Sequence, residues 1–172
     1  MPPALHFSLA ALLVALGLPA LGAEAPEPAR SIERLFRGGD AALALKRADA
    51  ALVERPGDAS LRFLKGVILE ETHREPEAIG IFEAMVQDFP DLPEPYNNLA
   101  VLVAAKGQLD RARELLEAAL RADPRYATAQ QNLGDVFLRL AQRAYESAGT
   151  KPADPRLERK LKLLRELATA TR

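Results

Sequence analysis

The sequence predicts an all-α solenoid of antiparallel helix hairpins wound into a right-handed superhelix, with about seven to eight helices that include a C-terminal capping helix. Within the successive units, apolar residues recur at i, i+3, i+4 and i+7, the pattern of one buried helix face. Two such stripes per unit indicate two helices. Prolines and small residues also recur at a spacing of 34, namely Pro56, Pro90, Pro124, Gly66, Ala100 and Gly134.

The first segment, residues 1–23, is predicted to be a secretory signal peptide. It lacks Asp, Glu, Lys and Arg, and its apolar run over residues 9–21 ends in small residues around Gly22 and Ala23. This run is shorter than the roughly 20 residues that a membrane-spanning helix needs. We therefore expect cleavage near Ala23 and a periplasmic mature protein, with a disordered apolar N-terminus as the alternative. Residues 24–30 are expected to form a linker.

The composition after residue 23 limits the function classes. Removal of 23 residues from the chain of 172 leaves 149, enough for one domain with a core. The absence of cysteine excludes disulfides and thiolate chemistry. A net charge of -1 argues against a nucleic-acid partner, which selects strongly basic surfaces.

The array is expected to span residues 31–149 and to begin with a partial repeat over residues 31–58. Pro26 and Pro28 are expected to shorten its first helix to about residues 31–37. Gly39 and Asp40 indicate a helix break and an N-cap for the second helix. Pro56 closes this unit.

Two complete repeats are predicted over residues 59–92 and 93–126. In the second, Tyr96 begins an apolar stripe, and Gly107 ends the helix because glycine tolerates the left-handed conformation of a terminal turn. Asp123 and Pro124 close the unit, since the residue before a proline is disfavoured in a helix. The first repeat is a looser copy of the second.

The last part of the chain departs from the period. Residues 127–149 fit a further, degenerate repeat only if five residues are deleted from its turn, so we expect one long helix over about residues 126–147. Residues 150–172 are expected to form a loop and an amphipathic capping helix with a stripe of Leu157, Leu161, Leu164 and Ala168. Contact of this helix with an anionic membrane or with another helix is the less favoured alternative.

The best-matching unit resembles the tetratricopeptide repeat. The resemblance rests on the residues Tyr96, Leu99, Ala100, Val103, Gly107, Ala112, Leu116, Ala119 and Pro124. It implies that the first helices of successive units line a concave surface, and that this surface binds an extended peptide or a helix of a partner protein. The stretch F-P-D-L-P-E-P-Y-N-N-L-A also resembles small exported repeat proteins of proteobacteria, which bears on location alone.

Two adjacent asparagines indicate the candidate binding surface. Asn97 and Asn98 lie off the apolar stripe, and their counterparts 34 residues later are Gln131 and Asn132. Stacked repeats are therefore expected to present two rows of amides, which offer donors and acceptors to a peptide backbone. Capping by Asn97 and simple solvation of Asn98 are the alternatives. The predicted partner-binding residues are Phe63, Leu64, Val67, Glu70, Asn97, Asn98, Val101, Gln131, Asn132 and Asp135.

The sequence offers no catalytic or metal-binding set. His73 is the single histidine after residue 23 and is expected to be exposed in a turn. Without a second imidazole or a thiol, neither a transition-metal site nor an imidazole-activated nucleophile can be assembled. We therefore expect no enzyme, cofactor or metal, and predict a scaffold that binds a protein partner. A self-assembling structural protein of the envelope, a homo-oligomer formed through the end faces or the C-terminal helix, is the alternative.

Overall fold

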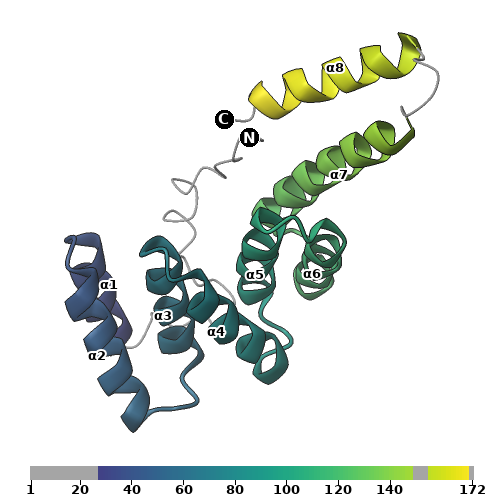
Figure 1. Ribbon diagram of the computed structural model, residues 1–172. Helices are drawn as coiled ribbons and strands as arrows, with labels where there is room; N and C mark the ends of the chain where they lie inside the picture. The colour runs from purple at the N-terminus through teal and green to yellow at the C-terminus, as the bar shows by residue number, and fades with distance from the viewer. Residues whose placement is uncertain (1–26, 149–154, 171–172) are drawn as a thin grey trace.

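The computed structural model describes residues 27–148 and 155–170, so the predicted signal peptide lies outside the described residues. Within the described ranges the chain forms eight α-helices and no β-strand, which confirms the predicted all-α hairpin solenoid (Figure 1). The helices are α1 (Glu27–Arg37), α2 (Ala41–Glu54), α3 (Ala59–Glu71), α4 (Glu75–Asp88), α5 (Pro93–Ala105), α6 (Leu109–Ala122), α7 (Ala127–Ala148) and α8 (Pro155–Ala170).

The helices pair as antiparallel hairpins that stack side by side. Figure 1 shows the α1/α2 pair at one end of the array and the α7/α8 pair at the other. Helix α3 contacts α1, α2 and α4, while α5 contacts α4, α6 and α7. Among first helices of neighbouring hairpins, α1 touches α3 and α5 touches α7, whereas α3 and α5 make no substantial contact with each other.

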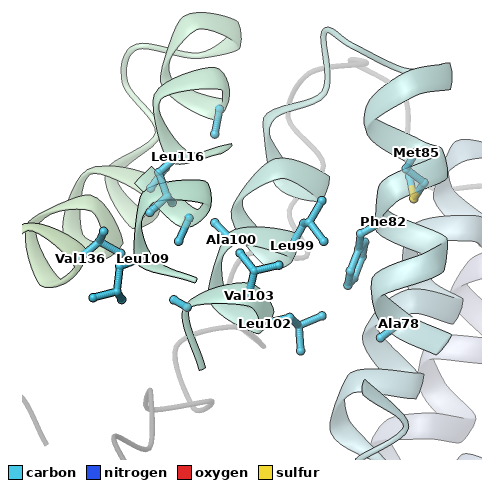
Figure 2. Packing of buried hydrophobic residues seen from close by; sticks show 14 of the residues in the cluster. Ala78, Phe82, Met85, Leu99, Ala100, Leu102, Val103, Leu109, Leu116 and Val136 are labelled. Atoms are coloured by element: carbon cyan, nitrogen blue, oxygen red, sulfur yellow. The ribbon is translucent and has the colours of Figure 1, made fainter. Parts of the chain in front are cut away.

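The core consists of two hydrophobic clusters. The smaller cluster lies among α1, α2 and α3 and contains Ile32, Ala48 and Leu64. The larger runs from α3 to α7 and includes Phe82, Leu116 and Val136 (Figure 2). Phe82 and Leu116 are almost completely buried, and each such side chain contributes roughly 1.5 to 3 kcal/mol to stability.

Each of the first three hairpins turns through one residue in the left-handed region. Gly39 has φ 91°, His73 has φ 59° and Gly107 has φ 78°, and these residues are 34 apart in sequence. The expected role of Gly107 is confirmed. His73 lies in its turn and is exposed, as expected.

The start of α1 corrects one prediction. The helix begins at Glu27, so residues 27–30 of the predicted linker are helical. Pro28 lies in the first turn, where a backbone N–H has no intrahelical acceptor and its loss is harmless. The Ser31 hydroxyl donates to the Pro28 carbonyl at 2.9 Å. The predicted N-cap is confirmed, because the Asp40 carboxylate accepts from the Leu43 backbone N–H at 3.0 Å.

The last hairpin differs from the others. The predicted long helix is confirmed: α7 is continuous over 22 residues and runs past the position where earlier hairpins turn. Helix α8 contacts the C-terminal part of α7, where Nζ of Lys160 on α8 lies 5.0 Å from the ring centroid of Tyr145 on α7. No helix among the described residues is long and apolar enough to span a membrane.

Candidate functional site

The neighbours of α3 determine which of its side chains remain available. Lys65 forms an ion pair at 2.7 Å with Asp49 of α2, and Gly66 faces the Phe82 ring of α4. At 100° per residue, Val67 and Glu71 point at least about 100° away from both of these directions, whereas Glu70 lies only about 40° from the direction of Gly66, on the side next to α4. We call the corresponding face of α3, α5 and α7, which lies away from α4 and α6, the first-helix surface.

The apolar residues predicted for this surface are largely packed within the protein. Phe63 is half-buried, and its ring lies 5.8 Å from the Phe82 ring, centroid to centroid. Leu64 and Val67 are each 4% exposed and belong to the two hydrophobic clusters. Val101 of α5 is half-buried. Among these four residues, Leu64 and Val67 therefore belong to the core, whereas Val101 keeps accessible surface.

The asparagines form a hydrogen-bonded relay instead of two exposed rows. Asn97 and Asn98 are 0% and 1% exposed, so they do not present their amides at the surface as expected, and the alternative that Asn98 is solvated is wrong as well. Asn132 Nδ2 of α7 donates to Asn97 Oδ1 at 2.8 Å, and Asn97 Nδ2 donates to Asn98 Oδ1 at 3.3 Å. The relay joins α5 to α7 and satisfies buried amide groups, while Gln131 stays exposed beside it.

One end of this relay is incomplete. Asn98 Nδ2 is buried and has no acceptor among the described residues. Asn132, 34 residues later, reaches back to the preceding first helix, α5. The repeat register therefore directs Asn98 back toward α3, on the side where Phe63 occupies the position equivalent to Asn97.

Two carboxyl groups near the end of α3 each have one buried oxygen without a donor among the described residues. Glu70 is 8% exposed, and the oxygens concerned are its Oε2 and Oε1 of Glu71. Burial raises the pKa of Glu70 to about 8, and the nearby charges of Glu71 and Glu75 add to the shift. Burial also raises the pKa of Glu71, although His73 opposes that effect.

Helix α7 contributes an acid and a base one turn apart. Desolvation raises the pKa of Asp135 and lowers the pKa of Arg139. A guanidinium nitrogen of Arg139, Nη1, is buried and has no acceptor in the described part of the chain. Sequence reasoning missed Glu71 and Arg139, which share one repeat position with Ala105 at a spacing of 34. The recurrence of this position in successive repeats was the signal that could have identified Glu71 and Arg139.

The arrangement offers binding groups rather than a metal centre. Over the described ranges, no group of three or more His, Cys, Asp or Glu side chains could hold a metal ion. The first-helix surface instead has carboxyl groups on α3, an apolar side chain and an amide donor on α5, and a guanidinium group on α7. Such a set can hydrogen-bond and pair charges with an extended polypeptide.

Comparisons with known proteins find the same repeat. Two family models, both described as tetratricopeptide repeat, match residues 32–93 and 73–133 and together span more than half of the chain. The TPR repeat-containing thioredoxin TTL4 of Arabidopsis thaliana is 39% identical over 67 residues, covering 38% of this chain and 10% of that protein. The chloroplastic tetratricopeptide repeat domain-containing protein PYG7 of the same plant is 33% identical over 103 residues, covering 54% of this chain and 34% of that protein.

Solved structures share the fold at low identity. The first TPR of Spaghetti (RPAP3), bound to the HSP90 peptide SRMEEVD, has a TM-score of 0.62 at 16% identity and covers 66% of this chain and 90% of that chain. The Yersinia enterocolitica type III secretion translocator chaperone SycD has a TM-score of 0.61 at 17% identity, covering 66% and 91%. MamA from Desulfovibrio magneticus has a TM-score of 0.60 at 21% identity, covering 83% and 75%.

Proposed function

The chain belongs to the tetratricopeptide repeat family, and we propose that it is a protein-protein interaction module that holds a segment of a partner protein on its first-helix surface, without chemistry of its own. Family membership supports a protein partner. A structural neighbour, the first TPR of RPAP3, is solved with a bound peptide.

One observation supports the placement on this surface. Four buried side-chain atoms lack a hydrogen-bond partner within the described residues, and all belong to first helices: Glu70 Oε2, Glu71 Oε1, Asn98 Nδ2 and Arg139 Nη1. A buried polar group without a partner costs roughly 1 to 3 kcal/mol. A polypeptide laid across α3, α5 and α7 supplies the missing donors and acceptors, which offsets that cost and favours binding.

The proposal is tested by site-specific photocrosslinking in the native cells. A photoreactive residue at Val101 or Gln131, on the first-helix surface, is expected to form a crosslink to one defined partner. The same residue at Gln87, exposed on α4, is expected to form none. Equal crosslinking from all three positions, or none from the first two, contradicts the proposal.

A substitution in the asparagine relay gives weaker evidence than the crosslinks. Replacement of Asn98 and Asn132 by alanine is expected to weaken capture of the partner, but it also leaves both polar atoms of the buried Asn97 side chain without partners. Because stability then falls as well, capture has to be measured below the unfolding temperature of the variant.

Location in the periplasm is part of the proposal and is supported by the pattern of residues 1–23. Fractionation of the native cells followed by N-terminal sequencing of the purified protein tests it. The expected result is a periplasmic chain that starts near Glu24. A cytoplasmic chain that starts at Met1 contradicts the location and leaves the binding function untouched.

Self-assembly through the C-terminal end is the second candidate function. Phe137 is 48% exposed, and Leu163 and Leu167 are each 51% exposed, so apolar side chains of α7 and α8 face solvent. Analytical ultracentrifugation with and without residues 155–172 separates the two functions. If the role is structural, the complete chain sediments as an oligomer and the truncated chain as a monomer. If the chain is a binding module, the complete chain already sediments as a monomer.

A further inference from the structure

Acidic charges surround the carboxyl group of Glu70, whereas His73 is a positive charge that acts on the carboxyl group of Glu71. Two cations close in sequence are engaged elsewhere, because Lys65 pairs with Asp49 at 2.7 Å and Arg74 donates to Glu77 at 2.6 Å. The charges that act on Glu70 are acidic, from Glu71 on α3 and Glu75 on α4. Helix α5 has one charged residue, Glu94 in its first turn, and α2 contributes Asp49.

A second, independent polar group without a partner belongs to the same surface. Asn98 is 1% exposed and its Nδ2 has no acceptor, while its Oδ1 is occupied by Asn97. By analogy with Asn132, the repeat register predicts that this amide faces Phe63 of α3, about two helical turns before Glu70. An unused donor therefore lies on the same surface as two unused acceptors, a combination that matches an extended segment with a backbone carbonyl at one point and a cationic side chain a few residues away.

We propose that Glu70 and Glu71 form a subsite for one basic side chain, lysine or arginine, of the bound partner segment. Asn98 Nδ2 donates to a backbone carbonyl of that segment. The inference rests on the proposed function and names the chemistry of the partner. A metal ion is a poorer occupant, because the described residues offer no third ligand close enough.

Occupation of this subsite is coupled to a proton. Near neutral pH, burial keeps Glu70 largely protonated, since its pKa is about 8. A cation brought against the carboxyl group favours the ionised form. Binding of a basic side chain at pH 7 therefore releases up to about one proton for each segment bound.

The test uses a library of acetylated and amidated nonapeptides with random sequences, selected on the purified chain. The selected peptides are expected to share one position occupied by lysine or arginine. Replacement of that residue by norleucine is expected to weaken binding to the wild type by about tenfold or more. On the Glu70→Gln variant the same replacement is expected to change affinity less than about twofold.

A matched control removes the same charge elsewhere. Glu114 lies on α6 with its side chain 69% exposed, and Glu114→Gln is expected to keep the full preference for the basic peptide. If Glu70→Gln fails to fold, as judged by circular dichroism, Glu71→Gln replaces it and is expected to reduce the preference in the same direction.

Calorimetry in two buffers with different ionisation enthalpies counts the protons at pH 7. The wild type is expected to release about one proton on binding the basic peptide and Glu70→Gln none. Equal proton counts, selected peptides without a basic position, or an unchanged preference in Glu70→Gln each overturn the subsite and leave the proposed function standing. If the library yields no binding peptide, the proposed function itself fails.

Discussion

At the scale of single residues, the hairpin turns show where the chain departs from its own pattern. Positions 39, 73 and 107 are equivalent, and all have positive φ. Glycine occupies two of them and histidine the third. A side chain with a Cβ is disfavoured in the left-handed region by roughly 1 to 2 kcal/mol, so His73 holds local strain that Gly39 and Gly107 avoid.

Replacement of His73 by glycine is therefore expected to stabilise the protein. The gain is expected to be about 0.5 to 1 kcal/mol, because the greater freedom of glycine in the unfolded chain offsets part of the relief. Urea unfolding measures it, with Gly107→His as the reverse change, which is expected to destabilise. A loss of stability in His73→Gly would show that the imidazole makes a compensating contact.

The Glu70 carboxyl group is expected to make stability depend on pH. Its pKa is raised from 4.5 to about 8 on folding, so the folded state binds its proton more tightly than the unfolded state. This contribution to stability is complete below pH 4.5 and is lost as pH rises to about 8. Glu70→Gln is expected to flatten that decline, and urea unfolding at pH 5.5 and 8.5 compares the two proteins. Parallel declines in the free energy of unfolding of both proteins would show that a group other than Glu70 binds the proton.

The sequence indicated the unusual asparagines but not their burial. Asn97 and Asn98 were recognisable because amides interrupt an apolar run. Their partners could not be assigned, since the decisive acceptor and donor lie on different helices, 35 residues apart for Asn97 and Asn132. Burial of a polar side chain depends on what the neighbouring helix presents, and helical periodicity along one segment does not report that.

At the scale of helices, two equivalent glycines have opposite surroundings. A Cβ on Gly66 would lie 2.6 Å from Phe82 Cε1, whereas a Cβ on Gly134 would have no neighbour within 4 Å. The difference arises because α4 folds back onto α3, while α7 continues past the equivalent turn and leaves this face uncovered. Phe137, equivalent to the buried Leu69, is correspondingly 48% exposed.

Alanine at these two positions is expected to have opposite effects. Gly66→Ala forces α3 and α4 apart and is expected to lower the free energy of unfolding by about 1 to 3 kcal/mol. Gly134→Ala meets open space in a helix interior and is expected to raise it by about 0.5 to 1 kcal/mol. Thermal unfolding of both variants provides the comparison. Equal destabilisation would mean that an unseen element covers Gly134.

The ends of the helices were harder to predict than the presence of the helices. The long helix α7 was predicted because the second apolar stripe of its repeat fits the 34-residue period only after five residues are deleted. This signal is spread over many residues. The start of α1 at Glu27 did not follow, because Pro28 is compatible both with a linker and with a first helical turn. The sequence pattern alone does not distinguish these positions of a proline.

At the scale of the whole molecule, each hairpin is stabilised only by its neighbours. Helix α5 lies in the middle and contacts α4, α6 and α7, while α8 contacts α7 alone among the described helix pairs with substantial contact. In such linear arrays, stability is approximately the sum of terms from units and their interfaces. The ends are therefore expected to open more readily than the centre.

Hydrogen exchange is expected to reveal this gradient. Backbone amides of α5 and α6 are expected to exchange most slowly and those of α8 fastest, because α8 leaves Leu163 and Leu167 half-exposed. Mass spectrometry of peptic fragments measures the order. Protection of α8 equal to that of α5 would indicate that α8 is covered by a second copy of the chain, in favour of self-assembly.

The asparagine relay has a direction, and that direction has a consequence for recognition. Asn132 of α7 donates to Asn97 of α5, and Asn97 in turn donates to Asn98 on the same helix. The group of Asn98 that lacks a partner is its Nδ2, so a visiting oxygen extends this sequence of bonds, whereas a visiting N–H meets another donor. The molecule thus favours a backbone carbonyl over a backbone N–H at this point, whatever side chains the visiting segment carries.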